Sequence, residues 1–284
     1  MSKVALVTDS TATIPGDLAK KFNITVVPQI LIWGNDTYQD GVDIQPNEFY
    51  SRLKTEKIMP TTSQVSPATM KSTFTELLNN DFDVLGIFVS TKLSGTIQSA
   101  LQGRDALPSG KNKIEIVDSN SIAMAMGFHV LAVARAISNG AKLLECKKLA
   151  ESARNHTGVF FAVDTLEFLH RGGRIGGAQR FLGSALNLKP ILAIENGGIE
   201  AIERVRTKGK ALDRILELVI EYTRGKSPIR LAVLHANADQ EARNLLEKAS
   251  LQLNAVDSIF TEVSPVIGTH AGPGTVGLAF MAGM

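Results

Sequence analysis

The chain has 284 residues, of which 44% are apolar, and its 30 basic and 28 acidic side chains leave a net charge of +2. This length allows one large or two medium domains, and the small charge gives no general attraction to nucleic acid or to an anionic membrane. The single cysteine, Cys146, excludes an internal disulfide. No apolar run approaches the roughly 20 residues of a membrane span, and no signal-peptide layout is present. We therefore expect a soluble, cytoplasmic protein without stable membrane insertion.

The first half of the chain alternates short apolar runs with helical patterns. Strands are predicted at 4–7, 25–27, 84–89 and 114–117, and helices at 15–22, 46–54, 67–78, from 96, and at 124–139. The segment between them continues as extended chain over 29–33, with a turn at 34–36, a loop at 38–43 and a hydroxyl-rich turn at 60–64. Such alternation predicts an α/β domain with a doubly wound, mostly parallel sheet, whose ligands bind at the carboxyl ends of the strands.

The second half has a different pattern. A strand is expected at 158–163, a glycine-rich basic loop at 171–177 and a helix at 178–186, and Asn196-Gly197-Gly198 is a strong hairpin signal. Further helices at 211–222 and 240–253 flank a strand at 229–234. A hairpin is foreign to a purely parallel fold. We therefore predict two domains, 1–156 and a mixed α/β domain at 157–284, and leave open whether the last residues return to the first domain.

The turn Ser94-Gly95-Thr96 lies between an expected buried strand and an expected helix. Unpaired backbone N–H groups and the helix dipole attract an anion at such a junction. A plain helix cap explains the same residues. A second hydroxyl-rich turn, with Thr61 and Thr62, and a glycine-rich tail carrying His270 favour the anion.

These three segments together would form a small pocket of neutral donors and one imidazole, which suits a carboxylate. A packing or capping role for His270 is the alternative. Its neighbours Gly268, Gly272 and Gly274 set it in a glycine-rich tail.

Two basic segments follow in the second half. Arg171 and Arg174 flank two glycines, and this loop would either grip a phosphoryl group or an acidic partner, or be a solvated turn. For the later run Arg204, Arg206, Lys208 and Lys210, a solvated strand edge is the favoured interpretation.

Signals for an enzyme are weak. The chain has no Gly-x-Ser-x-Gly elbow and no phosphate-binding G-x-x-x-x-G-K-[ST] loop. Asp9, Asp118 and Asp164 stand alone near strand ends, where they would position loops, and no metal site is predicted. Ser94, His270 and one of these aspartates match the residue types of a catalytic triad, but such a combination of residues arises easily by chance.

The chain resembles the DegV family over nearly its whole length. The matching motifs, in chain order, are Thr8-Asp9-Ser10-Thr11, Asp40-Gly41-Val42-Asp43, Thr62-Ser63-Gln64, Leu93-Ser94-Gly95-Thr96, Val117-Asp118-Ser119, Arg171-Gly172-Gly173-Arg174-Ile175 and Gly272-Pro273-Gly274. The resemblance implies two α/β domains and a buried long-chain fatty acid as ligand, with no other cofactor. It also implies a role like FakB, the fatty-acid-binding subunit of a bacterial fatty acid kinase, whose separate kinase subunit phosphorylates the carboxyl group for phospholipid synthesis.

The resemblance also implies roles for single residues. Ser94 and Thr62 would bind the carboxylate with Thr61 and Gly95 close by, and His270 would complete the network. The side chains implied to face the kinase or the phosphoryl group are Arg171, Arg174 and Arg204. Two alternatives stay open at this point: an acyl-ester or thioester hydrolase using Ser94 and His270, and a lipid carrier or sensor without a kinase. Acyl chain length and oligomeric state do not follow from the sequence.

Overall fold

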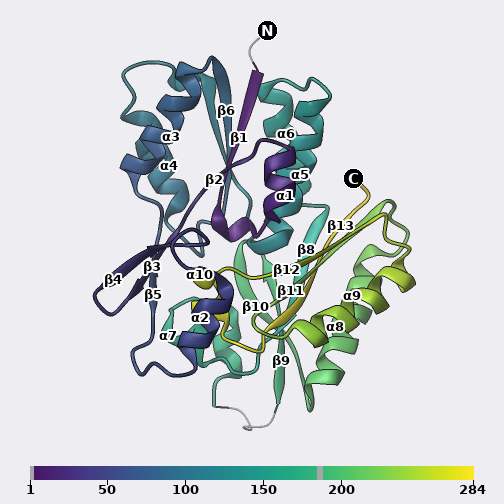
Figure 1. Ribbon diagram of the computed structural model, residues 1–284. Coiled ribbons are helices and arrows are strands. Elements are labelled where there is room, and N and C mark those ends of the chain that lie inside the picture. Colours follow the sequence, from purple (N-terminus) through teal and green to yellow (C-terminus); the bar gives the residue numbers. More distant parts are fainter. Residues whose placement is uncertain (1–2, 184–187) are drawn as a thin grey trace.

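The computed structural model describes residues 3–183 and 188–284, which form two main β-sheets with helices on their faces (Figure 1). The first sheet is parallel throughout, in the order β2-β1-β6-β7. Its strands are β1 (Lys3–Asp9), β2 (Thr25–Val27), β6 (Phe82–Phe88) and β7 (Ile114–Asp118). A short 3₁₀ turn, η1 (Ser10–Ala12), and α1 (Gly16–Lys21) connect β1 to β2.

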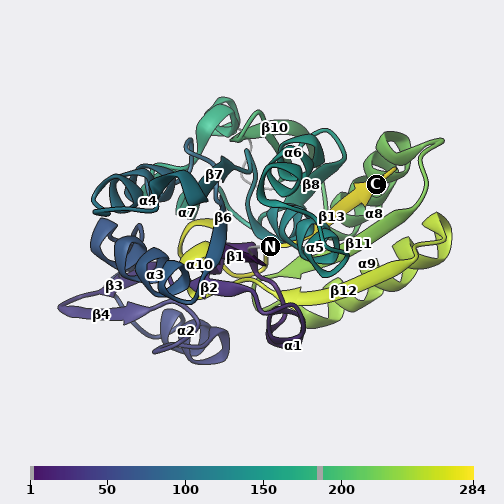
Figure 2. The same ribbon diagram turned by 90° about the horizontal axis from the view of Figure 1, so that it is seen from above.

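Helices cover both faces of this sheet (Figure 2). They are α3 (Pro67–Asn79) and α4 (Thr96–Asp105) on one face, and α5 (Ala123–Ser138) and α6 (Leu143–Ala153) on the other. Within β6, Val84 and Phe88 pack toward α3 and α4, whereas Leu85 and Ile87 pack toward α5 and α6. A strand buried on both faces is apolar at successive positions, as this one is. The predicted doubly wound parallel sheet is confirmed.

The second sheet has six strands of mixed direction, in the order β10-β9-β8-β13-β11-β12. They are β8 (Thr157–Ala162), β9 (Lys189–Glu195), β10 (Gly198–Val205), β11 (Ile229–His235), β12 (Asp257–Glu262) and β13 (Val276–Ala282). The turn between β9 and β10 contains Asn196 and Gly197, whose φ angles of 48° and 82° suit the tight turn of a hairpin. The predicted mixed sheet with a hairpin is confirmed.

Helix α5 lies between the two sheets. It contacts β1 and β6 of the first sheet and β8, β11 and β13 of the second (Figure 1). One apolar cluster therefore includes Leu85 from the first sheet, Met124 from α5 and Ala279 from the second. The other face of the second sheet is covered by α8 (Lys208–Thr223) and α9 (Asp239–Leu253).

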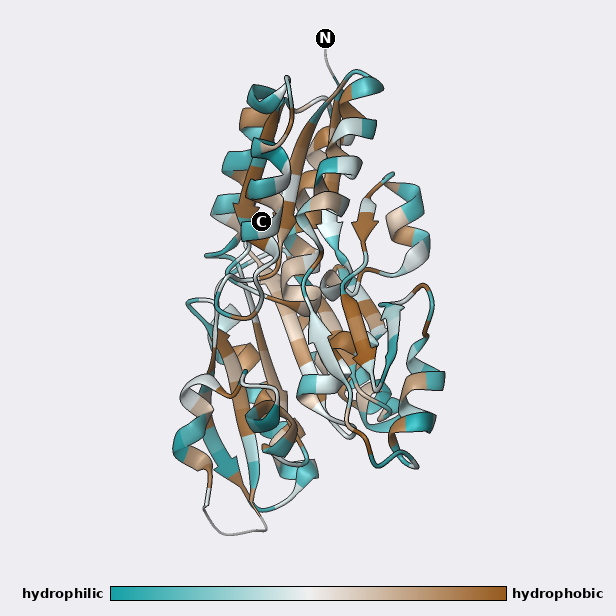
Figure 3. Ribbon diagram, turned by 90° about the vertical axis from the view of Figure 1, so that its left-hand side faces the viewer, coloured by the Kyte–Doolittle hydropathy of each residue, from teal (hydrophilic) through white to brown (hydrophobic). Residues whose placement is uncertain are grey.

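Hydropathy follows these layers. The strands of both sheets are largely hydrophobic, and the outer helices mix hydrophilic and hydrophobic positions (Figure 3). Within the described residues, no helix is both long and apolar enough to cross a membrane.

A third, antiparallel sheet corrects the expectation for residues 36–63. It has the order β4-β3-β5 and consists of β3 (Ile30–Trp33), β4 (Asp36–Gln39) and β5 (Thr61–Ser63). The expected loop at 38–43 is therefore wrong at Tyr38 and Gln39, and the expected turn at 60–64 is wrong at Thr61, Thr62 and Ser63. The central strand β3 pairs with β4 in a local hairpin, whereas its pairing with β5, such as Leu31 with Thr62, is distant in sequence. A three-residue strand leaves too short a pattern to recognise locally. Helix α2 (Pro46–Leu53) connects β4 to the segment that leads into β5.

The connection from β8 to β9 also differs from expectation. It contains α7 (Glu167–Arg171) and a 3₁₀ helix, η3 (Gly176–Phe181), where a helix over 178–186 was predicted. Residues 184–187 of that prediction lie outside the described part of the chain. The remaining short helices are η2 (Lys111–Lys113), before β7, and α10 (Pro265–Ala271), before β13.

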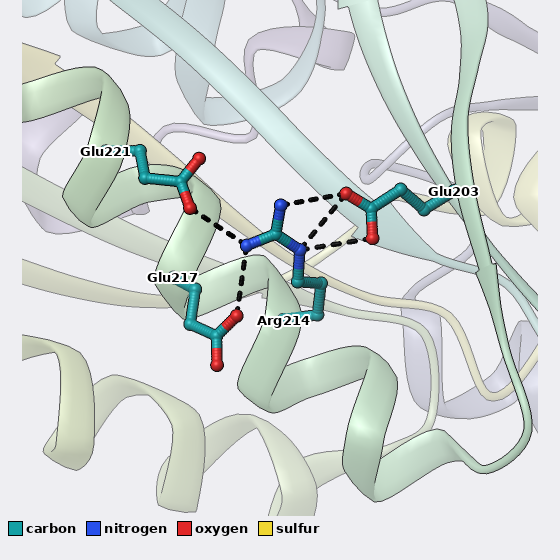
Figure 4. A network of polar contacts seen from close by, with 4 residues as sticks. All are labelled: Glu203, Arg214, Glu217 and Glu221. Carbon is teal, nitrogen blue, oxygen red and sulfur yellow. Dashed lines mark hydrogen bonds and ion pairs between the residues drawn. The ribbon is translucent and has the colours of Figure 1, made fainter.

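An ion-pair network centred on Arg214 connects α8 to the edge strand β10 (Figure 4). Arg214 on α8 donates from Nε and Nη2 to the Glu203 carboxylate of β10 at 2.8–3.1 Å. Its Nη1 donates to Glu217 and Glu221 at 3.0 and 2.9 Å. These hydrogen bonds raise the pKa of Arg214. The bidentate pair fixes the edge strand geometrically, although partly exposed ion pairs contribute little free energy individually.

Candidate functional site

One cavity is lined by residues of the second and third sheets, of α10, and of the segments that follow strands of the first sheet. Its apolar lining comes largely from the second sheet and from α10, and includes Val159, Phe161, Leu234 and Ile267, together with Val89 directly after β6. Its polar lining consists of Thr11, Gln29, Thr62, Ser63, Gln64, Ser94, Arg174, His270 and Thr275. Thr62, Ser94 and His270, which the sequence placed in three separate segments, therefore line one cavity.

Thr62 reaches this cavity because β5 is a strand. Successive side chains of a strand point to opposite faces, so the side chains of Thr61 and Thr62 point in opposite directions from β5. Thr62 lines it, and the neighbouring Thr61 is exposed. The Thr62 hydroxyl Oγ1 lies 2.7 Å from Nε2 of His270 on α10.

Ser94 lies just before α4, in the loop that leaves β6. Its backbone N–H donates to the Ser90 carbonyl at 3.0 Å, which closes a turn and directs the following residues into the helix. The Ser94 hydroxyl Oγ lies 2.9 Å from Oγ1 of Thr96, in the first turn of α4. Ser94 therefore combines a hydroxyl that faces the cavity with a position at a helix amino terminus.

Arg174 is held in the cavity wall by two backbone carbonyls. Its Nε donates to Leu93 at 3.2 Å, and its Nη1 donates to Gly172 at 2.7 Å. Leu93 precedes Ser94, and Gly172 lies against His270. The guanidinium thus connects the Ser94 and His270 parts of the site and adds the positive charge that the neutral donors lack.

His270 is a neutral imidazole at physiological pH. Burial, with a smaller contribution from the positive charge of Arg174, lowers the pKa of His270 to about 4. With its proton on Nε2, the imidazole donates to Thr62, and Thr62 keeps its own hydrogen for a ligand. Nδ1 is buried and has no hydrogen-bond partner among the described residues.

Other polar lining residues are already engaged. The Thr275 hydroxyl donates to the carbonyls of Ala271 and Gly272 at 2.9 Å each. The Thr11 hydroxyl donates to Asp9. The lining donors that remain include Thr62, Ser94, Arg174, Ser63 and Gln64, and much of the remaining lining is apolar. Such a cavity suits a molecule with an anionic head and an apolar tail.

Two expected carboxylate neighbours and two expected partner-facing arginines lie outside this lining. Thr61 and Gly95 do not line the cavity, and a side chain at Gly95 would collide with Gln64, whose amide lies over it. Arg171 is exposed on α7 and forms an ion pair with Glu167 at 2.6 Å. Arg204 is exposed on β10, with its guanidinium 4.7 Å from the centre of the Phe181 ring.

The three isolated aspartates have structural contacts. Asp9 is fully buried and accepts from the backbone N–H groups of Thr11 and Val89 at 3.0 Å each. Asp118 accepts from the Thr91 hydroxyl at 2.8 Å, and Asp164 pairs with Lys189 at 3.0 Å. Over the described ranges, no three His, Cys, Asp or Glu side chains are grouped to hold a metal ion.

Sequence reasoning missed Gln29 as a residue of the site, and with it the contact that Gln29 makes with Thr96 of the turn 94–96. Gln29 follows β2 and is 2% exposed, and its amide Nε2 donates to Oγ1 of the fully buried Thr96 at 2.8 Å. A glutamine inside an apolar extended segment was the available signal, because buried amides need partners.

Comparison with known proteins gives consistent results. The model of the DegV family, described as uncharacterised proteins, matches residues 3–283. A DegV domain-containing protein of Halalkalibacterium halodurans is 36% identical over 283 residues, which is 99% of each chain.

Two solved structures are similar along the whole chain. One is reported for fatty acid binding of a DegV family protein from Thermus thermophilus, with a TM-score of 0.93, 35% identity and 99% of each chain covered. The other is DegV of Bacillus subtilis, described as a fatty acid binding protein, with a TM-score of 0.90, 34% identity, and 99% of this chain and 100% of that chain covered.

Proposed function

The chain belongs to the DegV family, and on this premise we propose that it binds a long-chain fatty acid in the cavity. The acyl chain occupies the apolar lining, and the carboxylate accepts hydrogen bonds from Thr62 and Ser94 beside Arg174. His270 contacts the Thr62 hydroxyl through Nε2 and orients it. The observation that carries the proposal is the convergence of these four side chains in one cavity that is otherwise largely apolar.

The energetics suit an amphiphile. Each hydrogen bond to a charged acceptor contributes about 1.5–3 kcal/mol, and each buried CH₂ contributes about 0.8 kcal/mol. A long acyl chain therefore supplies most of the gross affinity, while the donors select the head group and fix its place.

We further propose that the protein has no catalytic activity of its own and presents the acid to a separate, ATP-dependent fatty acid kinase in the cytoplasm. Arg174 would face the carboxylate and the incoming phosphoryl group, because it lines the cavity. Arg171 and Arg204 are exposed and would contact the kinase. Acyl phosphate formed in this way would enter phospholipid synthesis.

A hydrolase is less well supported by the same geometry. A serine nucleophile needs a base within hydrogen-bond reach. In the described residues, His270 Nε2 contacts Thr62, and the partner of the Ser94 hydroxyl is Thr96. Ser94 is thus placed to bind rather than to attack. A lipid carrier or sensor that works without a kinase shares the binding step and differs only in the partner.

Native mass spectrometry followed by lipid extraction tests the ligand. We expect a mass increase of one long-chain fatty acid per chain, in protein as purified or after delipidation and reloading with palmitate. Absence of bound acid from both preparations would overturn the proposal. Acyl phosphate formation from the loaded protein, ATP and a fatty acid kinase then separates the kinase-linked role from that of a plain carrier.

A further inference from the structure

A buried chain of hydrogen bonds leads from Asp9 to Ser94 behind the cavity. Gln29 donates from Nε2 to Oγ1 of Thr96 at 2.8 Å, and Oγ1 of Thr96 lies 2.9 Å from Oγ of Ser94. Gln29 is 2% exposed, and Thr96 and Asp9 are fully buried, so these groups depend on protein partners for their hydrogen bonds. The direction of each hydrogen bond is therefore decided by the protein.

The orientation of the Gln29 amide follows from its neighbour Asp9. The Asp9 carboxyl group accepts from the backbone of Thr11 and Val89; burial raises its pKa, and hydrogen bonding, including that from the Gln29 side chain, opposes this rise. An amide turned the other way would set its oxygen against this carboxylate. The NH₂ group of Gln29 therefore faces both Asp9 and Thr96.

The available donors and acceptors then determine the direction in which the hydroxyl groups of Thr96 and Ser94 donate. Thr96 Oγ1 accepts from Gln29, and its own hydrogen needs an acceptor because the side chain is fully buried. Ser94 Oγ is its one acceptor among the described residues. Since Thr96 donates to Ser94, the Ser94 hydrogen is left to point into the cavity.

We propose that Gln29 is a positioning residue that acts through Thr96 to make Ser94 a hydrogen-bond donor toward the ligand head group. The inference rests on the proposed fatty-acid binding and deepens it, because it specifies the class of head group. An acceptor such as a carboxylate or an acyl phosphate is favoured, and a head group that can only donate, such as an alkylammonium, is rejected. Without the Gln29 donor, the Ser94 hydroxyl can turn toward Thr96 and offer a lone pair instead.

The test compares palmitate with hexadecanol, titrated into delipidated protein. A structural defect in the cavity weakens the binding of both ligands, whereas loss of the Ser94 donor mainly weakens the binding of palmitate, which has the carboxylate. In Gln29→Met, which keeps the side-chain length, we expect palmitate affinity to fall about tenfold or more relative to hexadecanol. Gln98→Met, the same change at an exposed glutamine of α4, is the matched control and should bind both ligands as the wild type does.

A double-mutant cycle shows whether Gln29 works through Ser94. Ser94→Ala should lower the preference for palmitate over hexadecanol at least as much as Gln29→Met does. In the double variant, this preference should fall no further than in Ser94→Ala alone. Additive losses, equal weakening of both ligands, or an unchanged preference in Gln29→Met would each overturn the inference. Should Gln29→Met fail to fold, Thr96→Val breaks the same chain and should shift the preference in the same direction. Failure of the wild type to bind palmitate would instead refute the proposed function itself.

Discussion

Thr62 and His270 lie within 2.7 Å of each other, although 208 residues separate them in the chain. Thr62 lies on β5. His270 lies on α10, which follows every strand of the two main sheets except β13 along the chain. The pair therefore exists only in the folded molecule. Their contact brings two polar residues from distant segments together in the lining of one cavity.

Thr62→Ala should weaken palmitate binding. The variant removes one hydrogen bond to a charged acceptor, so the dissociation constant should rise about tenfold or more. Isothermal titration of delipidated protein measures this change. Thr61→Ala is the matched control, because Thr61 is exposed and does not line the cavity. Equal losses in the two variants would show that the strand, rather than the Thr62 hydroxyl, matters.

Ser94→Ala separates binding from hydrolysis. We expect the variant to bind palmitate more weakly, and neither it nor the wild type to turn over acyl esters faster than buffer. Hydrolysis of a p-nitrophenyl ester is followed by absorbance. Turnover by the wild type that disappears in Ser94→Ala would support the hydrolase instead.

His270 should make folding stability depend on pH. Its pKa is lowered to about 4 in the folded protein, below the usual 6.5, so the unfolded chain binds more protons between these values. The contribution of the neutral imidazole is therefore present above pH 6.5 and is lost as the pH falls toward 4. In His270→Asn, the free energy of unfolding should decrease less over this range than in the wild type. Urea denaturation of ligand-free protein at several pH values measures the difference, and parallel curves would contradict the assignment.

Gly172→Ala should displace His270. A Cβ atom at Gly172 would lie 2.1 Å from His270 Nδ1, so the imidazole must move away from Thr62. Palmitate affinity should fall about tenfold through loss of the oriented Thr62 donor. At Gly173, φ is +68° and no atom lies within 4 Å of an added Cβ. Gly173→Ala should therefore cost about 1 kcal/mol of stability through backbone strain and leave affinity unchanged. Equal effects on affinity would refute this steric explanation.

Arg174→Ala and Arg171→Ala should differ in palmitate binding. Arg174 lines the cavity, whereas Arg171 is exposed and paired with Glu167. We expect Arg174→Ala to weaken palmitate binding and acyl phosphate formation, and Arg171→Ala to reduce only acyl phosphate formation with a fatty acid kinase. Titration and a hydroxamate assay measure the two properties. Loss of palmitate binding in Arg171→Ala would place that arginine in the binding site.

Much of the fold could be predicted from local patterns. The run from Val84 to Val89 is apolar at most positions because both faces of β6 are buried, and Asn196-Gly197 marks a hairpin because both residues adopt positive φ. The small sheet could not be predicted in the same way. Strand β5 has three residues and is defined by its pairing with β3, which depends on tertiary structure.

The same limit applies to the site. Thr61 and Thr62 look equivalent in the sequence, and only the strand pairing decides which one faces the cavity. Gln29 and Thr96 are separated by 67 residues and meet in the buried core. Arg174 could be recognised as a functional arginine, but its two bonds to backbone carbonyls depend on how the loop after α7 folds.

Carbon-13 NMR of carboxyl-labelled palmitate on delipidated protein tests the central claim most directly, because it observes the head group itself. We expect one protein-bound carboxyl resonance, distinct from that of free palmitate, which shifts in both Thr62→Ala and Ser94→Ala and stays in place in Thr61→Ala. No bound resonance, or one that is identical in all four proteins, would contradict the assignment of this cavity as the fatty-acid carboxylate site.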